Sequence, residues 1–539
     1  MIKKKHLEFL FLLFVFSLLL WMGVAGVYQN KLSHDFPHGF MAMDSFWKLG
    51  RAQNLDQTGN QFYAQEHLAS DLEGVVETYP PLLATSTVLL HRLSGLEVYD
   101  SIFFLTVLFA VFAALVMYLL IRDFNKNLAI IAAGLFGFLF YGSFYIGHIW
   151  GRGPLIIGSM FLVTIFWSIN KLKLKRSYLL VGFLLAASFL SHPPEFMIAI
   201  AFIVFYFVIQ LLIKRFNFSE LKTTIIAVAL SLILSLSYLP IFLIGGGNSG
   251  IKLFTVITKS SEPAPYALDF SFFLIFIVIG AIFAILHFIK KKKINVALLV
   301  SLFMLLITYS NYLGNAKRAF QNRYFWPIYL SLFFALGIYH LAKIVIKKWK
   351  SSYSLIMGVG LLILFLIFFH QPITSPGLAN EYNWDAFEWI RAETPENAKL
   401  YFFYGDSYGQ SSFLSSTFRS SYLVNTDDYV KALNEGKIKQ HLLTKEIRMK
   451  GKLPYKTGML SYGSYIDDGV RNYTVEKIED VCEFDYYIAD RGSRYPELAN
   501  YNILMLNTLI KNEWIEEVYS NSLVVVLKNN NPGADCIGN

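Results

Sequence analysis

Residues 101–121 read SIFFLTVLFAVFAALVMYLLI, a run without a charged side chain that is followed at once by Arg122. A helix needs about 20 mostly apolar residues to cross the hydrocarbon core of a bilayer, so this run predicts a membrane-spanning helix. The other apolar runs of similar kind are 7–27, 128–147, 153–170, 178–191, 195–213, 223–245, 269–289, 294–309, 324–346 and 353–370. Together they predict a polytopic α-helical membrane protein with about 11 transmembrane helices.

The composition points to the same class of protein. Of the 539 residues, 55% are hydrophobic, 17% are aromatic and only 16% are charged, whereas soluble domains are about 45–50% apolar and about 25% charged. These values exclude a disordered chain, a collagen-like fibre, a coiled coil and an ordinary soluble enzyme.

The net charge of +9 divides unevenly along the chain. Residues 1–370 hold 30 Lys and Arg against 15 Asp and Glu, while residues 371–539 hold 17 against 23. Cytoplasmic loops collect Lys and Arg, and with 11 spans all the main basic clusters fall on one side. This predicts a cytoplasmic N-terminus on an uncleaved first helix, and an extracytoplasmic loop 28–100 and C-terminal segment. The clusters are Lys3–Lys5, Arg122/Lys126, Lys171–Arg176, Lys214/Arg215/Lys222, Lys290–Lys293 and Lys343–Lys350.

The basic excess is therefore interpreted as membrane topology, and no nucleic acid is expected as a partner. Residues 80–95, PPLLATSTVLLHRLSG, decide the number of spans. The segment is apolar but short and contains His91 and Arg92, so we interpret it as an interfacial or re-entrant helix on the outer face. If it crossed the membrane, the later Lys clusters would change sides.

The C-terminal part differs from the rest of the chain. Residues 371–539 predict a soluble, extracytoplasmic α/β domain that follows the transmembrane domain 1–370, with a helix over 384–392 and strands over 399–404, 484–489 and 522–528. The two cysteines, Cys482 and Cys536, both lie in it. They form either a disulfide or two unpaired thiols, and the spacing does not decide between them.

One carboxylate in the loop 28–100 stands out. Asp44 lies in FMAMDSFWKLGRA (40–52), where Phe40, Met43, Phe46, Trp47 and Leu49 predict an apolar surface around it. A partly desolvated carboxylate is more basic than a solvated one, and a general base for a sugar hydroxyl needs this property. The other acidic residues of the loop are interpreted as solvated charges: Asp35, Asp56, Glu66, Asp71, Glu73 and Glu77.

At these residues the chain resembles the GT-C class of glycosyltransferases, which are multi-helix membrane enzymes that use polyprenyl-phosphate-linked sugars. The resemblance lies in the order of short motifs over about 400 residues rather than in any single motif. They are Asp44 early in the first outer loop, Tyr79-Pro80-Pro81-Leu82, Leu190-Ser191-His192-Pro193, Arg323 with Pro327, and Trp389-Ile390 with Thr394-Pro395 and Ala398.

The resemblance implies transfer of a hexose from a polyprenyl-phosphate donor to a lipid, glycan or protein acceptor on the outer face. Asp44 is the candidate base, and Lys317, Arg318 and Arg323 are candidate cations for the leaving phosphate, with headgroup anchoring as their alternative role. The first loop lacks a DxD or ExD pair, so the metal site is predicted as none. The absence of Trp-Trp-Asp from the C-terminal part favours a single-sugar transferase over an oligosaccharyltransferase.

Three further residues are candidates for substrate binding. His148 and Arg152 lie in the glycine-containing turn 147–154 and offer hydrogen-bond donors between two helices, with a purely structural helix-to-helix turn as the alternative. His192, next to Pro193, either orients the donor phosphate or pairs with Glu195 as a helix-end histidine. The alternative functions are a transporter or flippase, which would carry paired repeats and intramembrane charge, and a non-catalytic scaffold or sensor.

Overall fold

The computed structural model describes most of the bundle and the centre of the C-terminal domain. The described residues are 4–25, 31–40, 43–62, 76–77, 79–149, 151–240, 271–291, 295–309, 326–346, 348–368, 377, 379–403, 415–423, 446–449, 463–467, 470–472, 477–491, 503 and 506–536.

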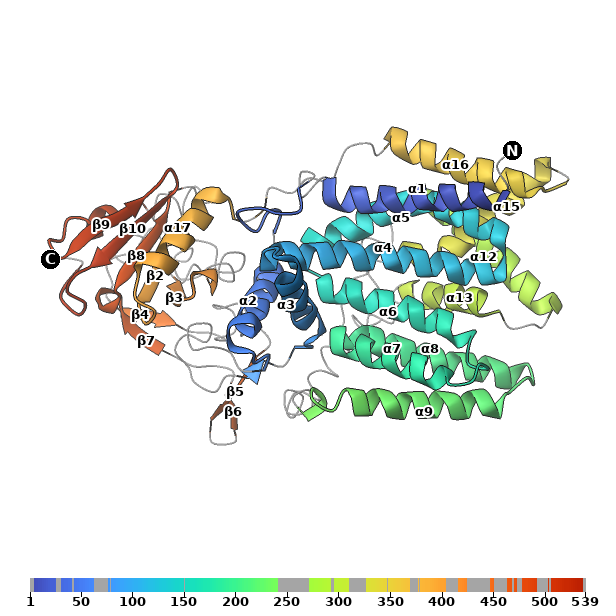
Figure 1. Cartoon of the computed structure of the whole chain (residues 1–539), viewed down its shortest axis with the longest axis horizontal. Helices are drawn as coiled ribbons and strands as arrows, with labels where there is room; N and C mark the ends of the chain where they lie inside the picture. Colours follow the sequence, from blue (N-terminus) through green and yellow to red (C-terminus); the bar gives the residue numbers. More distant parts are fainter. Residues whose placement is uncertain are drawn as a thin grey trace, which may run out of the picture.

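Apolar helices form a long bundle, with the C-terminal sheet beyond one of its ends (Figure 1). Each of the eleven apolar runs predicted from the sequence overlaps a helix of this bundle. These helices are α1 (Lys4–Ala25), α4 (Val98–Phe124), α5 (Lys126–Ile149), α6 (Gly153–Ile169), α7 (Ser177–Ser191), α8 (Pro193–Leu212), α9 (Phe218–Leu234), α12 (Ser271–Lys291), α13 (Val296–Tyr309), α14 (Trp326–Tyr329) with α15 (Ser331–Val345), and α16 (Ser351–Phe368).

Four of the described helices are long and apolar enough to cross a membrane: α1 over His6–Ala25, α4, α8 and α16. Most of the others are apolar but shorter. One expected continuous helix is interrupted, because α14 ends at Tyr329 and α15 starts at Ser331. The hydroxyl of Ser301 on α13 donates to the carbonyl of Tyr329 at 3.1 Å. This bond gives a partner to a backbone group at the break, as an interruption inside a bundle requires.

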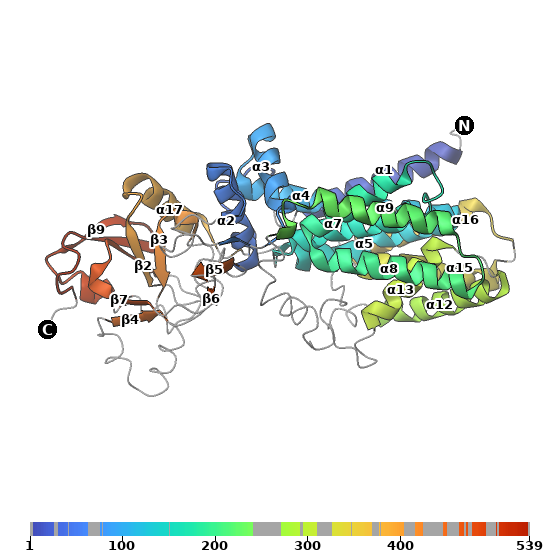
Figure 2. The same cartoon turned by 90° about the horizontal axis from the view of Figure 1, so that it is seen from below.

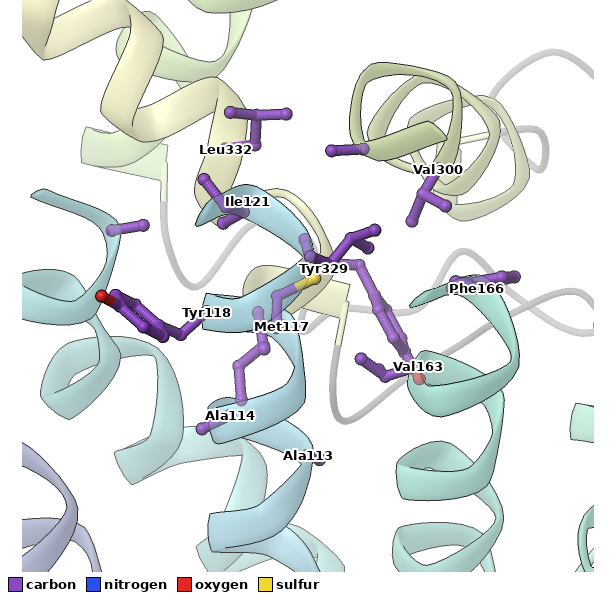
Figure 3. Close-up of a cluster of buried hydrophobic side chains, with 14 of the residues drawn as sticks. Ala113, Ala114, Met117, Tyr118, Ile121, Val163, Phe166, Val300, Tyr329 and Leu332 are labelled. Carbon is purple, nitrogen blue, oxygen red and sulfur yellow. The ribbon is translucent and has the colours of Figure 1, made fainter. Parts of the chain in front are cut away.

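The centre of the bundle is an apolar core. Figure 3 shows Tyr329 reaching from α14 toward Val163 and Phe166 of α6, beside Met117 of α4. Phe166 and Tyr329 are fully or almost fully buried and meet edge to face, with ring centres 6.2 Å apart. The turns α4–α5, α6–α7 and α8–α9, which carry basic clusters, lie at the end of the bundle marked by the N-terminus (Figure 1). We call the other end, which faces the C-terminal domain, the site end.

Two short helices cover the site end. They are α2 (Met43–Thr58), which comes from the segment predicted as an outer loop, and α3 (Leu82–Ser94), which coincides with the short helix predicted over 80–95. α3 runs across the ends of the bundle helices rather than along them (Figure 2). Its first half packs inward through Leu83, Ala84 and Val88, whereas Leu89 and Leu93 near its end are 60% and 77% exposed.

In the part of the C-terminal domain that the structure describes, the helix α17 (Glu381–Glu393) is followed by a five-stranded mixed sheet. The sheet has the order β3-β2-β8-β10-β9, in which β2 runs parallel to β3 and β8 and the remaining pairs are antiparallel. Its strands are β2 (Lys399–Phe403), β3 (Ser420–Leu423), β8 (Tyr486–Asp490), β9 (Ile515–Ser520) and β10 (Val524–Asn529). The smaller sheets join β1 (Val76–Glu77), β5 (Gly463–Asp467) and β6 (Val470–Asn472), and β4 (Glu446–Met449) with β7 (Lys477–Asp480).

The central strands are apolar at successive positions because both faces of the sheet are buried. Side chains of a strand alternate between its two faces. In β2, Leu400 and Phe402 lie in one apolar cluster and Tyr401 and Phe403 in another. The second cluster contains the cysteines: Cys482 and Cys536 form a disulfide, the arrangement that the spacing alone left open.

The first cluster extends out of the C-terminal domain. It contains Phe46, Leu49 and Ala52 of α2, together with residues of α3 and α4, and joins them to Trp384 and Phe387 of α17. We call this cluster the shared core. Its members from both parts are almost completely buried. The C-terminal domain is therefore packed onto the helix that carries Asp44.

Candidate functional site

Asp44 lies in the first turn of α2 and faces the start of α6. Its Oδ2 accepts from Nη1 of Arg152, the N-cap residue of α6, at 2.7 Å. The side chains are 15% and 31% exposed, so the pair is partly buried but reachable from solvent. The structure thus brings together two of the site residues predicted from separate segments.

A glycine makes this contact sterically feasible. Gly151 has φ +66°, a backbone conformation that L side chains rarely adopt. A Cβ at this position would lie 2.3 Å from the backbone nitrogen of Ser45 and 2.6 Å from the carbonyl carbon of Asp44. Only a residue without a side chain lets the α5–α6 turn approach the α2 backbone closely enough for Arg152 to reach Asp44.

The surroundings of Asp44 differ from the prediction. The sequence predicted an apolar surface around the carboxylate, and Phe46, Trp47 and Leu49 are indeed buried. The carboxylate itself faces the Arg152 guanidinium instead. The reason is helical geometry, because Phe46 and Leu49 point into the shared core while Asp44 lies on a different face of α2.

Two buried cations on α2 were not among the predicted site residues. Lys48 and Arg51 are only 5% and 3% exposed and follow Asp44 by one and two turns of the helix. Nζ of Lys48 lies 3.2 Å from the centre of the Trp47 ring and 3.7 Å from that of Tyr79. Aromatic faces stabilise a desolvated cation in this position. In the sequence, Asp44, Lys48 and Arg51 are spaced i, i+4 and i+7, which places them on one face of a helix. This spacing could have predicted the two cations as site residues.

Arg51 also fixes the start of α3. Its Nη2 donates to the carbonyl of Tyr79 at 2.9 Å, and both terminal nitrogens lie 3.3 Å from the carbonyl of Pro80. Near the C-terminal ends of both helices, Nε of Arg92 on α3 donates to Asp56 of α2 at 2.7 Å. α2 and α3 are therefore held together at two points.

A shallow hollow, open to solvent and with enclosed room for about one water molecule, lies between Ser45 and Gly151, the chain neighbours of Asp44 and Arg152. α2 contributes Ser45 and Lys48 to its lining, and the α5–α6 turn and start of α6 contribute Gly151 and Gly153. The rest of its wall consists of Phe40, Leu83, Ile102 and Thr106. A polar group entering this hollow would meet one cationic side chain and a mostly apolar wall.

His192 lies at the junction of α7 and α8, one to two turns along α6 from the hollow. Its Nδ1 bonds the carboxylate of Glu195, so the pairing considered from the sequence is present. Gly158 of α6 packs against both, since a Cβ there would lie 3.0 Å from Cβ of His192. Glu195 is 2% exposed and His192 is partly buried. This arrangement suits a helix-end histidine in the α6–α8 packing.

The other predicted site residues lie wholly or partly outside the described residues. His148 belongs to the last turn of α5, and its side chain lies outside the described residues. Lys317, Arg318 and Arg323 also lie outside them. Within the described part of the chain, no group of three or more His, Cys, Asp and Glu side chains is arranged to hold a metal ion. A metal-independent site stays a prediction.

No protein-family model and no curated protein sequence matches the chain. Solved structures do match. The oligosaccharyltransferase AglB from Archaeoglobus fulgidus, in complex with an inhibitory peptide and a dolichol-phosphate, superposes with a TM-score of 0.57 at 13% identity, over 89% of this chain and 69% of that one. ArnT from Cupriavidus metallidurans bound to undecaprenyl phosphate gives 0.53 at 10% identity, over 98% and 99%. The arabinofuranosyltransferase AftD from Mycobacteria gives 0.50 at 13%, over 97% and 40%.

The chain has the GT-C fold. This confirms the resemblance found in the sequence and the prediction of a helical membrane protein. In this GT-C fold the Asp44–Arg152 pair, Lys48 and the hollow all lie at the site end of the bundle, next to the C-terminal domain.

Proposed function

We propose that the protein is an integral membrane glycosyltransferase that moves one sugar from a polyprenyl-phosphate donor to an acceptor on the outer membrane face. The observation that carries the proposal is the Asp44–Arg152 pair beside a hollow lined by Lys48, within a GT-C fold. A carboxylate and several cations are the groups that such a transfer needs. AglB and ArnT, solved with dolichol-phosphate and undecaprenyl phosphate, support a lipid phosphate as the donor's carrier.

In the proposed reaction, an acceptor hydroxyl oxygen bonds the anomeric carbon of the sugar as the bond from that carbon to the phosphate oxygen breaks. Asp44 takes the hydroxyl proton, and polyprenyl phosphate leaves with the bonding electrons. Arg152 engages Oδ2 of Asp44, and the described residues give Oδ1 no ion pair, so Oδ1 is the atom assigned to the proton.

The cations are proposed to stabilise the leaving phosphate. As the phosphate departs, its negative charge grows, and fixed positive charges at that point stabilise the transition state more than the ground state. Lys48 lines the hollow, and Arg152 lies at its edge. Lys317, Arg318 and Arg323 are assigned to the same task, and His148 is proposed to orient the donor, while His192, paired with Glu195, keeps the helix-end role. Because Asp44 faces an arginine rather than further carboxylates, we expect turnover in the presence of EDTA.

The fold also supports a topology. We place the C-terminal domain and α3 outside the cell membrane and the N-terminus in the cytoplasm, with eleven spans. The Cys482–Cys536 disulfide supports this placement, because disulfides persist in oxidising compartments. α3, with exposed Leu89 and Leu93 beside Arg92, suits the membrane–water boundary.

This topology predicts the labelling of introduced cysteines. Both native cysteines are bonded to each other, so an introduced cysteine is the single free thiol. In intact cells, a membrane-impermeant maleimide is expected to label Ser94→Cys, at the end of α3, and not Arg215→Cys, in the α8–α9 turn. The Arg215→Cys protein should become labelled after permeabilisation, and the parent protein should stay unlabelled throughout. The reverse pattern would invert the proposed orientation.

The activity itself is tested with the full-length protein in lipid nanodiscs and a set of polyprenyl-phosphate hexoses. We expect release of polyprenyl phosphate together with an equal amount of glycosylated acceptor when membrane lipids and oligosaccharides are supplied. Release that persists in EDTA supports the metal-free mechanism. If no lipid-linked sugar is consumed, while the protein in sealed vesicles moves one across the bilayer, the chain is a flippase and the proposal is wrong.

A further inference from the structure

The segment Lys31–Phe40 connects the first helix to the site and is held by a buried carboxylate. We call this segment the strap. Asp100, in the first turn of α4, accepts from the backbone N–H of His34 at 2.9 Å, and its other oxygen lies 3.0 Å from His34 Nδ1. The Asp100 side chain is fully buried. A buried charge is stable only when it is hydrogen-bonded, so this double contact fixes the strap to the bundle.

Tyr99, next to Asp100 on α4, also holds the strap and connects it to the C-terminal domain. The hydroxyl of Tyr99 donates to the carbonyl of His34 at 2.6 Å, and the Tyr99 ring meets Trp384 of α17 edge to face, with centres 5.7 Å apart. Gly377, just before α17, packs on the strap as well: a Cβ there would lie 3.3 Å from the nitrogen of Gly39.

The far end of the strap forms part of the site. His38 stacks on His34 with ring centres 5.4 Å apart, and burial together with His34 lowers the pKa of His38. Two residues later, Phe40 is 1% exposed and meets Phe46 of α2 edge to face at 5.5 Å. Phe40 also lines the hollow. The strap therefore links the Asp100 contact to both the wall of the hollow and the helix that carries Asp44.

We propose that Asp100 and His34 are positioning residues, and that Trp384 of the C-terminal domain acts with them through Tyr99. Asp100 is sealed from solvent, so it acts by holding the strap and not by touching substrate. Because the strap is held in place, its Phe40 packs on Phe46 and fixes the distance between α2 and the α5–α6 turn. That distance in turn sets the geometry of the Asp44–Arg152 pair. The proposal rests on the proposed glycosyltransferase function and adds the part of the chain that sets its geometry.

The first test replaces Asp100 by asparagine in the full-length protein. We expect kcat for sugar transfer to fall on the order of 10- to 100-fold, because small displacements of a catalytic group are costly, while KM for the donor changes little. Asp35→Asn is the matched control, since Asp35 lies in the same strap but is exposed. Its kcat is expected to equal that of the parent protein.

A second measurement does not depend on activity. In hydrogen–deuterium exchange, the amides of α2 and the strap should exchange faster in Asp100→Asn, with α7 and α8 unchanged. Tyr99→Phe, which removes one hydroxyl and keeps the ring on Trp384, is the milder variant if Asp100→Asn fails to fold. Trp384→Ala should show the same local pattern, and Trp514→Ala should not, because Trp514 is 43% exposed and lies outside the shared core.

The outcomes separate the two proposals. If folded Asp100→Asn and Tyr99→Phe keep the parent kcat and the parent exchange in α2, the positioning role is overturned. If these variants only lower the melting temperature, with kcat and the amide exchange of α2 unchanged, the contact is merely structural. That result also overturns the positioning role. If the parent protein consumes no lipid-linked sugar, the glycosyltransferase function fails, and the exchange pattern still decides whether the strap positions α2.

Discussion

Replacement of Asp44 by asparagine is expected to lower kcat for sugar transfer by about 10²- to 10⁴-fold, the usual contribution of a general base. Asparagine keeps the size of the side chain and can still face Arg152, but it cannot take a proton from the acceptor. The fold should survive, because Asp44 lies outside the shared core. The measurement is release of polyprenyl phosphate in nanodiscs, with equal loading of folded protein checked by gel filtration.

Asp56→Asn is the matched control for this variant. Asp56 is on the same helix and is also bonded to an arginine, Arg92 of α3 at 2.7 Å, but it lies toward the far end of α2 from the hollow. We expect its kcat to stay within about twofold of the parent value, since surface ion pairs contribute little. Full activity of Asp44→Asn would remove Asp44 from the mechanism and leave the fold assignment intact.

Replacement of Gly151 by alanine is expected to damage both stability and activity. The added Cβ would lie 2.3 Å from the Ser45 nitrogen, and the colliding atoms are backbone, so α2 and the α5–α6 turn must separate. The left-handed backbone costs about 1–2 kcal/mol for a residue with a Cβ, and overpacking typically adds about 1–3 kcal/mol. We therefore expect a clear fall in melting temperature and a loss of kcat by more than about tenfold, because separation draws Arg152 away from Asp44.

Gly59→Ala separates these two effects. Gly59 has almost the same φ, +69°, but a Cβ added there would meet no atom beyond its adjacent chain segment within 4 Å among the described parts of the chain. It should show the conformational cost alone, as a small fall in melting temperature with unchanged kcat. Equal behaviour of the two variants would mean that the close approach at Gly151 does not set the geometry of the site.

Much of the architecture could be predicted from the sequence because it follows from solvent preference. Apolar runs of membrane length and the position of basic clusters depend on local composition, and each predicted run overlaps a bundle helix. The predicted strands near 399–404, 484–489 and 522–528 coincide with β2, β8 and β10, and most of their residues are apolar. β3 and β9 were missed: β3 reads SSYL, and β9 reads IEEVYS with exposed acidic residues.

The site was less predictable because its contacts join distant segments. Asp44 and Arg152 were each predicted as candidates, but nothing local to either segment indicates that the two form an ion pair. The apolar surface expected around Asp44 belongs to other faces of α2, which only the packing of the C-terminal domain defines. Lys48 and Arg51 were missed because the segment 28–100 was treated as a loop, which hides the helical spacing that places them near Asp44.

The shared core sets an order of events during synthesis. Leu49 of α2 is buried with Val526 of β10, near the opposite end of the chain. At about 5–20 residues per second, a ribosome needs roughly half a minute to a minute and a half to make the residues between them. Throughout that time the apolar side of α2 lacks its final cover, and Asp44 is held only by the bundle. The surroundings of Asp44 are thus complete only after the last strands of the nascent chain have been translated, so a truncated chain that lacks β10 is expected to be inactive toward lipid-linked sugars.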